Sequence, residues 1–496
     1  MIAHTATTVI KGFNSVVVTV ECYITNGLPS FNIVGLPDKS INESRERVRA
    51  AITNSGYKFP AKRVTINLLP ASVTKDGSHL DLAIALSILV ASKQLQQSDV
   101  DSTLFIGELG LDGSIQAVRG VLSLTEGAHT AGFKQVVVPA ANGQQAALID
   151  GIDVVSATTI NSVVLHLLGE KPLQKASANI VQNTCTINNL LDDIYGQEMA
   201  KRALEIAAAG HHNILLSGPP GSGKTMLAKA LVGLLPPLTP SEILETTKLY
   251  SLANESDDII VARPFRAPHH TASHVALTGG GSTLKPGEVS LAHNGVLFLD
   301  EMPEFSKHTL EALRQPLEDH VIHISRASGQ ATYPANFMLL GTMNPCPCGY
   351  AGDIDHECTC SPQAISAYQK KISGPLLDRI DLFLRVDRVP QKDLSRGSAV
   401  KLADQYREAI HQAMMRQLQR QGNFNSSLSN KQLKECAQTD PKAQQLLTTA
   451  AEQLKLSARS YFKTLRVAKT IADLATHDII TVADMAEALQ YRQLSA

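Results

Sequence analysis

The residues best suited to chemistry in this sequence form a glycine-rich loop that follows an apolar run at residues 213–217. Glycines permit backbone angles that direct successive N–H groups at phosphate oxygens, and a helix after the loop would aim the positive end of its dipole at the same anion. In such a loop a lysine reaches the β- and γ-phosphates, and a threonine hydroxyl binds Mg²⁺. The residues predicted to hold a nucleotide are Gly218, Pro219, Pro220, Gly221, Ser222, Gly223, Lys224 and Thr225.

A pair of adjacent carboxylates, Asp300 and Glu301, ends a second apolar run at residues 295–299. Such a run is typical of a central parallel strand that is buried on both faces, and open α/β sheets bind ligands at the carboxyl ends of their strands. Asp300 is expected to hold Mg²⁺ together with Thr225, and Glu301 to orient and deprotonate an attacking water. The two segments together predict hydrolysis of ATP with Mg²⁺ as cofactor.

A cluster of cysteines follows at residues 346–360, where two Cys-x-Cys pairs hold four of the seven cysteines of the chain. Four thiolates can close a tetrahedral structural Zn²⁺ site with no position open for catalysis. The clustering favours a metal over free cysteines in a flexible loop, although Cys-x-Cys spacing is less common than Cys-x₂-Cys. An iron–sulfur cluster uses the same ligands, and His356 is a further candidate. The predicted zinc ligands are Cys346, Cys348, Cys358 and Cys360.

The composition is that of an ordinary globular protein, with 496 residues, 44% hydrophobic and 18% charged. This length suits about two to four domains. The net charge of −1 means that nucleic-acid binding must use a local basic surface, and the 4% aromatic content without tryptophan argues against extensive base stacking. We see no signal peptide and no membrane-length apolar stretch, so we expect a cytoplasmic protein without membrane spans.

Periodicity and composition divide the chain into four predicted parts. Alternating apolar strands mixed with helices give way to a polar stretch, then to the glycine-rich loop and its neighbouring strands, and finally to helical spacing. The predicted parts are a mixed α+β domain at residues 1–168, a linker at 169–188, an α/β P-loop core at 189–390 and an all-helical region at 391–496.

Four short segments outside the P-loop match motifs of one family. Ile194 and Tyr195 precede a charged helix, Asn344 ends an apolar run at residues 337–343, Arg379 lies in Leu-Leu-Asp-Arg-Ile-Asp, and Arg459 opens a late helix. These segments resemble the AAA+ ATPases. The chain as a whole resembles the ComM/YifB family of Mg-chelatase-like ATPases.

The resemblance implies a role for each of these residues. Ile194 and Tyr195 would pack on the adenine, and Asn344 would position the lytic water as sensor 1. Arg379 would be the arginine finger, which in AAA+ rings acts on the nucleotide of the neighbouring subunit, so the family implies a homo-hexamer. Arg459 would be sensor 2.

Both arginines also have alternative interpretations. Arg379 could instead form a surface salt bridge with Asp378 or Asp381. Arg466 lies two helical turns beyond Arg459 on the same predicted helix, so it competes with Arg459 for the sensor 2 assignment.

The family also implies names for the parts of the chain. Residues 1–168 resemble the Lon protease C-terminal domain, a ribosomal S5 domain 2-like fold, and residues 391–496 a helical lid of the Mg-chelatase C-terminal type, with the cysteines in an insertion of the AAA+ core. Matching the Lon motif places His79 at the nucleophilic serine and Leu122 at the lysine. Leucine cannot take a proton, and the neighbouring Ser78 has no evident base, so we expect a non-catalytic domain.

The family implies a hexameric DNA motor that promotes branch migration or acts as a helicase in homologous recombination during natural transformation, with single-stranded or branched DNA as partner. Lys285 and Arg326 lie in two insertions that face the pore in ring translocases, and both are candidates for phosphate contacts. Solvated loop charges explain each of them nearly as well. The alternative is a Mg-chelatase-like or MoxR-like ATPase that remodels a protein client. A further alternative is a metal chelatase motor that inserts Mg²⁺ into a porphyrin, and the first domain, which shows no resemblance to a chelatase component, argues against it.

Overall fold

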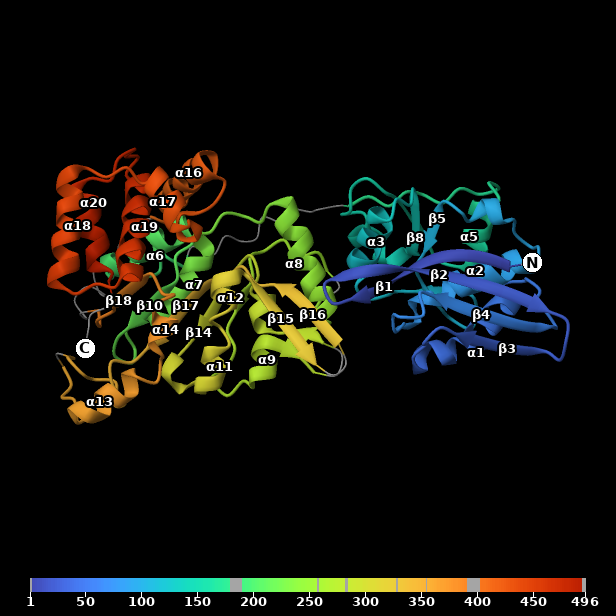
Figure 1. Cartoon of the computed structure of the whole chain (residues 1–496), viewed down its shortest axis with the longest axis horizontal. Helices are drawn as coiled ribbons and strands as arrows, with labels where there is room; N and C mark the ends of the chain where they lie inside the picture. The colour runs from blue at the N-terminus through green and yellow to red at the C-terminus, as the bar shows by residue number, and fades with distance from the viewer. Residues whose placement is uncertain are drawn as a thin grey trace. The chain divides into compact units, whose positions relative to one another are not determined.

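A five-stranded parallel sheet forms the centre of the region that holds the glycine-rich loop in the computed structural model of the chain (Figure 1). Its strand order is β11-β14-β17-β10-β18, and every neighbouring pair is parallel. The carboxyl ends of β10, β14 and β17 therefore meet at one edge, where the predicted nucleotide residues follow them. The strands are β10 (Ile214–Ser217), β11 (Phe265–Arg266), β14 (Val296–Leu299), β17 (Met338–Met343) and β18 (Leu382–Arg385).

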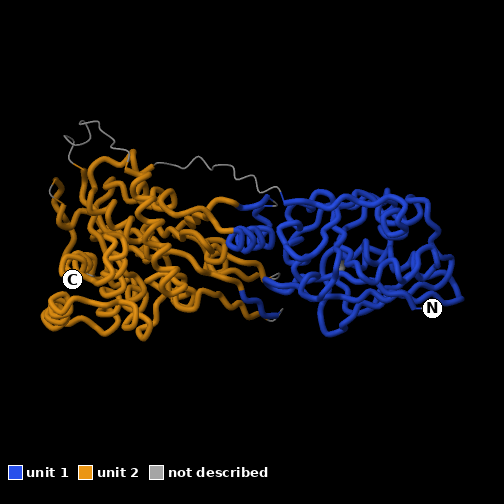
Figure 2. The backbone as a smooth tube through the Cα atoms, turned by 90° about the horizontal axis from the view of Figure 1, so that it is seen from above, with its two compact units in different colours: residues 1–181, 240–260, 329–332 blue, residues 182–239, 261–328, 333–496 orange. Residues whose placement is uncertain are grey.

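The structure describes residues 2–178, 190–256, 258–281, 284–326, 329–353, 355–389 and 402–492. The chain divides into two units, which Figure 2 draws in different colours. The first unit comprises residues 1–181, 240–260 and 329–332. The second comprises residues 182–239, 261–328 and 333–496.

Helices of the second unit pack around the parallel sheet and continue into the C-terminal region. One apolar core joins the helix before β10 and the helix after it to the helices beyond residue 402. The buried Gln417 fixes this junction because its side-chain amide donates a 2.9 Å hydrogen bond to the Ala209 carbonyl. The helices are α6 (Glu198–Gly210), α7 (Lys224–Leu234), α16 (Ala403–Gln421), α17 (Asn430–Cys436), α18 (Pro441–Gln453), α19 (Ala458–Leu474) and α20 (Val482–Gln490).

Short elements fill the chain between the strands of this sheet. They include two two-stranded sheets, β12 with β13 and β15 with β16. The elements are α9 (His274–Thr278), β12 (Gly279–Gly280), β13 (Lys285–Pro286), α10 (Glu288–Leu291), α11 (Lys307–Glu311), α12 (Pro316–Asp319), β15 (Val321–Arg326), β16 (Gly329–Pro334), α13 (Pro362–Gln369) and α14 (Gly374–Leu377).

A mixed seven-stranded sheet forms the first unit, in the order β3-β4-β2-β1-β5-β8-β9. The pairs β1–β2 and β2–β4 are antiparallel, and the other neighbours are parallel. A separate small sheet pairs β6 (Glu108–Leu109) with β7 (Ile115–Gln116). The strands of the large sheet are β1 (Ile2–Lys11), β2 (Asn14–Thr25), β3 (Ser30–Val34), β4 (Arg63–Leu69), β5 (Thr103–Phe105), β8 (Gln135–Pro139) and β9 (Asp153–Ala157).

The helices of the first unit follow from local sequence signals. Asp38 caps the first helix, because its carboxylate accepts a 2.8 Å hydrogen bond from the Ile41 N–H. The second helix is apolar nearly all round and is correspondingly buried, from Asp81 to Val90. The helices are α1 (Lys39–Asn54), α2 (Asp81–Ala91), α3 (Val121–Thr130), α4 (Gly143–Ala146) and α5 (Ile160–Leu167).

The first unit also includes α8 (Pro240–Ala253), which the sequence argument placed within the P-loop core. Lys248 of this helix has a buried side chain that forms an ion pair with Glu126 and lies 3.9 Å from the centre of the Phe13 ring. The Ser251 hydroxyl accepts a 3.0 Å hydrogen bond from the Gly120 N–H. These contacts tie a segment that is distant in sequence to α3.

The mixed α/β architecture, with a parallel sheet and a helical C-terminal region, agrees with the coarser part of the predicted fold class, a multidomain α/β chain with a helical C-terminal region. The names of the individual domains stay predictions. Part of the predicted linker packs on the first unit, since the Ala176 N–H donates to the Val154 carbonyl at 2.9 Å. Residues 179–189 and 390–401 lie outside the described part of the chain. Within the described ranges no helix is long and apolar enough to cross a membrane.

Candidate nucleotide site and cysteine cluster

The glycine-rich loop connects β10 to α7 and depends on close backbone approaches. A Cβ atom on Gly218 would lie 2.1 Å from the Val386 carbonyl oxygen, so a larger residue would displace the backbone. Gly223 caps α7 with a φ of 87°, a left-handed conformation that favours glycine. The loop therefore leads directly into the first turn of a helix whose dipole favours anions.

The Lys224 ammonium connects this loop to the other predicted site residues. Its Nζ atom donates hydrogen bonds to two carbonyl oxygens of the loop at 2.7 and 2.9 Å, and it lies 3.4 Å from the side-chain oxygen of Asn344. Burial lowers the pKa of Lys224, while the carboxylates of Asp300 and Glu301 raise it. The structure thus brings the predicted P-loop lysine, sensor 1 asparagine and carboxylate pair together.

Thr342 contacts both residues of the carboxylate pair, the side chain of Asp300 and the backbone of Glu301, although the sequence argument did not single it out. Its side chain is buried on β17. The Thr342 hydroxyl donates a 2.6 Å hydrogen bond to Asp300 Oδ1 and accepts a 2.9 Å hydrogen bond from the Glu301 N–H. The sequence places a hydroxyl two residues before Asn344, on the strand that lies beside β14. This spacing is the signal that could have identified Thr342.

The oxygen atoms at this edge of the sheet suit Mg²⁺. A threonine hydroxyl and a carboxylate are hard ligands of the kind that Mg²⁺ prefers, with water and phosphate oxygens completing its octahedron. Thr225 lies in the first turn of α7, and the hydrogen bond from Thr342 orients the Asp300 carboxylate. The donor set therefore fits the predicted cofactor.

A pocket of about 1050 Å³ opens beside the glycine-rich loop. Ile194 and Tyr195, predicted to pack on adenine, line this pocket together with Gly221 of the loop. Two arginines that the sequence argument missed, Arg385 and Arg388, line it as well. The pocket thus combines apolar side chains suited to a base with two arginines, each of which faces an aspartate of the same wall, Arg385 facing Asp387 at 2.9 Å and Arg388 facing Asp353 at 3.7 Å.

The predicted arginine finger and sensor 2 lie together in a different pocket, of about 510 Å³. Arg379 donates to the Pro375 carbonyl at 2.6 Å and forms an ion pair with Glu318. Arg459 lies 4.0 Å from the same Glu318 carboxylate and 3.7 Å from Asp378. Neither arginine is among the residues that line the pocket beside the glycine-rich loop.

The side-chain contacts of Arg379 and Arg466 bear on the two alternative interpretations given above. Arg379 pairs with Glu318 rather than with Asp378 or Asp381, because the Asp381 carboxylate faces His212 at 3.3 Å. The Arg466 guanidinium donates to the Leu428 carbonyl at 2.9 Å and to the Asn430 side chain at 3.0 Å. Arg459, by contrast, has a side chain that is 59% exposed.

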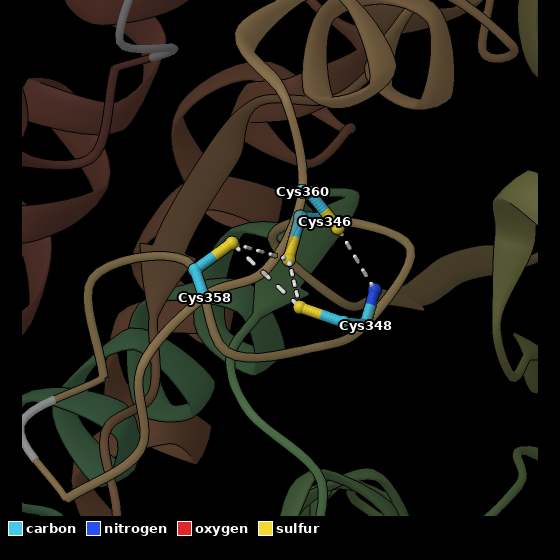
Figure 3. A group of neighbouring side chains, drawn as sticks. All are labelled: Cys346, Cys348, Cys358 and Cys360. Atoms are coloured by element: carbon cyan, nitrogen blue, oxygen red, sulfur yellow. Dashed lines mark hydrogen bonds between the residues drawn. The ribbon is translucent and has the colours of Figure 1, made fainter.

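The four predicted zinc ligands converge in one cluster (Figure 3). The Cys346 sulfur lies 3.3 Å from that of Cys348 and 3.7 Å from that of Cys358, and the Cys348 and Cys358 sulfurs are 3.6 Å apart. The Cys360 sulfur accepts a 3.4 Å hydrogen bond from the Cys348 N–H. All four sulfurs lie within 4.8 Å of one another, so the cluster is compatible with Zn²⁺.

Hydrogen bonding favours the thiolate form at one of the four cysteines, Cys348, whereas the pKa values of Cys358 and Cys360 are raised. The backbone N–H of Tyr350 is the main cause that lowers the pKa of Cys348 to about 6. His356, the further candidate ligand, is not part of the group of four cysteines. Its ring stacks on that of Tyr350 with centroids 4.8 Å apart, and its Nδ1 atom lies 3.1 Å from the Arg388 guanidinium.

The two candidate DNA contacts come from neighbouring two-stranded sheets. Lys285 lies on β13 and pairs in register with Gly280. Arg326 ends β15, and its Nε atom lies 3.6 Å from the position that a Cβ on Gly280 would take. The hydroxyl of Tyr333 donates to the Leu284 carbonyl at 2.7 Å, which fixes β16 to the same insertion. The structure thus places Lys285 and Arg326 near each other.

The residues at the Lon-like positions of the first unit are buried. His79 lies 2.9 Å from the Thr8 carbonyl through Nε2, and burial lowers its pKa to about 4. Leu122 is fully buried on α3. The Ser78 hydroxyl donates to the Glu108 carboxylate, a partner that the sequence argument missed because it lies on a separate small sheet.

Comparison with known proteins identifies the family. Competence protein ComM of Haemophilus influenzae is 43% identical over 491 residues, which cover 97% of this chain and 96% of that protein. The chain belongs to the ComM/YifB family of Mg-chelatase-like proteins. An uncharacterised YifB protein of Escherichia coli is 41% identical over 486 residues, covering 97% and 95% of the two chains. The architecture described above agrees with a Mg-chelatase-like AAA+ fold.

Family models cover three segments of this ComM/YifB protein. Residues 190–394 match the model of magnesium chelatase, subunit ChlI, and residues 401–492 match the model of its C-terminal part. Residues 20–142 match a model described as subunit ChlI of Mg-chelatase. The expectation that the first domain lacks any resemblance to a chelatase component is therefore wrong. The magnesium-chelatase 67 kDa subunit of Chlorobaculum parvum is 26% identical over 155 residues, or 31% of this chain and 23% of that protein.

Proposed function

We propose that this protein is an ATP-hydrolysing DNA motor that works as a homo-hexamer and drives branch migration or unwinding in homologous recombination during natural transformation. The observation that carries the proposal is the 43% identity to Competence protein ComM along 97% of the chain. The clustered P-loop, carboxylate pair and sensor asparagine support the ATP-hydrolysing part. The coupling to DNA rests on the family resemblance.

Each residue of the nucleotide site has a role in the proposed hydrolysis. Lys224 and the loop N–H groups would bind the phosphates, and Ile194 and Tyr195 the adenine. Glu301 would take a proton from the attacking water on a carboxylate oxygen while the Asn344 amide orients that water. Bound Mg²⁺, held through Thr225 and Asp300, would neutralise charge on the phosphates.

The positions of Arg379 and Arg459 support action on a neighbouring subunit. Both arginines line a pocket different from the one beside their own glycine-rich loop. A guanidinium stabilises transition-state charge only if it reaches the γ-phosphate. A ring in which each subunit presents this arginine pair to the next subunit's nucleotide would meet that requirement. Glu318 would then hold the pair in place until the neighbouring subunit docks.

The insertions with Lys285 and Arg326 are the proposed DNA contacts. The chain carries almost no net charge, so a DNA motor of this composition needs local cationic points rather than a general positive field. Two cations on adjacent two-stranded sheets would provide such a point in each subunit, repeated around the ring.

Remodelling of a protein client, as by a Mg-chelatase-like or MoxR-like ATPase, is the second candidate. The observation in its favour is that the descriptions of all three matching family models name magnesium chelatase. Such a motor would use the same nucleotide site but would respond to a protein rather than to DNA. The response to DNA therefore discriminates between the two functions.

The deciding experiment measures ATP turnover without DNA and with single-stranded, double-stranded and four-way-junction DNA at two salt concentrations. We expect salt-sensitive stimulation by single-stranded or junction DNA, because phosphate contacts release counterions. Glu301→Gln serves as the control that binds ATP with little turnover. Turnover that is indifferent to every DNA would favour the remodelling function instead.

A further inference from the structure

The cysteine loop forms part of the wall of the nucleotide pocket. Gly352, Asp353 and Asp355, which lie between the two Cys-x-Cys pairs, line the same pocket of about 1050 Å³ as Tyr195 and Gly221. The loop starts directly after β17, the strand that ends just before Asn344. The cysteine cluster is therefore built next to the nucleotide-binding residues, not on a remote surface.

Backbone packing joins this loop to the glycine-rich loop. Gly349 has a φ of 89°, and a Cβ atom there would lie 2.8 Å from the ring of Pro220. Only a glycine allows the two loops to come this close. A change in the position of the cysteine loop would therefore act directly on the phosphate-binding loop.

Asp353 and Arg388 form the polar link between the two loops. The Asp353 side chain is 4% exposed, and its Oδ1 atom accepts hydrogen bonds from the N–H groups of Asp355 and His356 at 2.8 and 3.1 Å. Its Oδ2 atom, which has no hydrogen-bond partner among the described residues, faces Arg388 Nε at 3.7 Å. Arg388 in turn donates to the Pro220 carbonyl at 3.3 Å.

Aromatic contacts hold the same arginine from the other side. The Arg388 guanidinium lies 5.7 Å from the centre of the Tyr350 ring, and Tyr350 stacks on His356. Every contact named here except the Pro220 carbonyl comes from the cysteine loop. The position of this positive charge in the nucleotide pocket therefore depends on the fold of the cysteine loop.

The sulfur positions indicate what stabilises that fold. A tetrahedral ion with bonds of about 2.3 Å places its sulfur ligands about 3.8 Å apart, close to the 3.3–3.7 Å separations of Cys346, Cys348 and Cys358. An iron–sulfur cluster distributes its cysteines over several irons, which requires wider spacing than sulfurs all within 4.8 Å. The geometry suits a single ion.

We propose that the cysteine cluster binds one Zn²⁺, and that this ion sets the nucleotide affinity by fixing Asp353 and Arg388 against the glycine-rich loop. The inference rests on the nucleotide site of the proposed function. Arg388 acts as a positioning residue, because its positively charged guanidinium lines the pocket and donates to the Pro220 carbonyl of the glycine-rich loop. Asp353 keeps that charge in place, and the metal keeps Asp353 in place.

The first experiment measures the zinc content of the full-length protein and its affinity for a fluorescent ADP analogue, before and after metal removal and after zinc is added back. We expect one zinc per chain, nucleotide binding weakened by about tenfold without metal, and recovery on re-addition. Circular dichroism checks that the stripped protein stays folded. Absence of metal in the purified protein, or unchanged affinity in the folded stripped protein, would overturn the proposal.

Variants distinguish the effect of the metal from the effect of the contact between Asp353 and Arg388. Cys346→Ser with Cys358→Ser should lose both zinc and nucleotide affinity, whereas Cys436→Ser, a cysteine outside the cluster, should keep both. If the double variant does not fold, the single variants Asp353→Asn and Arg388→Gln still test the proposal. Each should retain zinc yet bind the ADP analogue more weakly.

Two further variants show whether charge or packing matters. Arg388→Lys should recover part of the affinity lost in Arg388→Gln, because it restores a cation without the planar guanidinium. Glu357→Gln, an exposed charge change in the same loop, should leave affinity unchanged. Wild-type affinity for the ADP analogue in both Asp353→Asn and Arg388→Gln would refute the link between Asp353 and Arg388.

These binding experiments contain no DNA, so their results do not depend on whether DNA stimulates turnover. A failure of DNA to stimulate turnover would count against the proposed function alone.

Discussion

Thr342 Oγ1 donates a 2.6 Å hydrogen bond to Asp300 Oδ1 and, through the same oxygen atom, accepts the backbone N–H of Glu301. One buried hydroxyl on β17 therefore orients the proposed Mg²⁺ ligand and fixes the backbone of the proposed general base, both of which directly follow β14. This link joins two parallel strands at the edge where the nucleotide would bind, so it connects the order of the sheet to the chemistry.

Removal of this hydroxyl should impair turnover. Thr342→Val keeps the shape of the side chain but leaves Asp300 and the Glu301 N–H without their partner, and an unsatisfied buried group costs about 1–3 kcal/mol. We expect a higher Mg²⁺ concentration for half-maximal turnover and a kcat lower by about tenfold. Thr342→Ser, which retains the hydroxyl, is the control. Equal Mg²⁺ dependence in the valine and serine variants would contradict the role.

The arginine finger can be tested by mixing variants. Arg379→Ala should assemble but lose about 10³-fold or more in turnover, and Lys224→Ala should lose nucleotide binding. A mixed ring should recover activity at interfaces where a Lys224→Ala subunit presents its intact Arg379 to a neighbour with an intact P-loop.

The matched control mixes Lys224→Ala with Glu301→Gln. Both residues serve the nucleotide of their own subunit, so no interface in that mixture is complete and turnover should stay low. Mixed assembly is verified by pulling down one tagged variant with the other. A mixed Arg379→Ala and Lys224→Ala ring without recovered turnover would show that the arginine does not act on its neighbour.

Acid should destabilise the first unit through His79. Burial lowers its pKa from 6.5 to about 4, so the unfolded chain takes up the proton first as the pH falls. The stabilising contribution is complete above pH 6.5 and is lost between pH 6.5 and about 4, amounting to about 3 kcal/mol.

The measurement compares the wild type with His79→Gln, which cannot titrate but can still donate to the Thr8 carbonyl. Urea unfolding is followed by hydrogen exchange in peptides that cover α2, at several pH values from 7 to 4. The wild type should lose more stability than the variant over this range. Parallel pH profiles for the two proteins would rule out His79 as the source.

The sequence was sufficient for the features that depend on local order along the chain. The glycine-rich loop, the carboxylate pair and the cysteine pairs each lie in one short segment, and the structure groups each set as the spacing suggested. Lys224 and Asn344 could be expected to meet because both follow buried strands, and parallel strands expose their carboxyl ends at one edge.

Features that depend on which strands are neighbours could not be read in this way. Thr342 reaches Asp300 only because β14 pairs with β17 in the register that sets Leu299 opposite Gly341. Arg388 reaches the glycine-rich loop because β18 lies beside β10. Neither pairing can be recognised from a single sequence, since the four strands are all mainly apolar and none of them specifies its neighbour.

The placement of α8 in the first unit shows a second limit. In sequence, α8 lies between two segments of the second unit. The continuity of the chain therefore favoured assigning this helix to the P-loop core. Its buried Lys248 pairs with Glu126, 122 residues away. A lysine on a helix is ordinarily solvated, and nothing in its neighbours along the chain indicates a buried partner.

The proposed DNA contacts predict a specific change in salt dependence. Lys285→Ala with Arg326→Ala should weaken binding to single- and double-stranded DNA alike, because phosphate contacts carry no sequence information. If each cation binds one phosphate per subunit, the slope of log affinity against log salt should decrease by about 0.7–0.9 for each phosphate that is no longer bound. Fluorescence anisotropy of labelled DNA over a range of salt concentrations measures this slope. Lys431→Ala with Lys442→Ala removes the same charge from exposed positions of α17 and α18 and should leave the slope unchanged. An equal decrease of the slope in both double variants would mean that net charge, rather than local binding at the two insertions, governs the affinity for DNA.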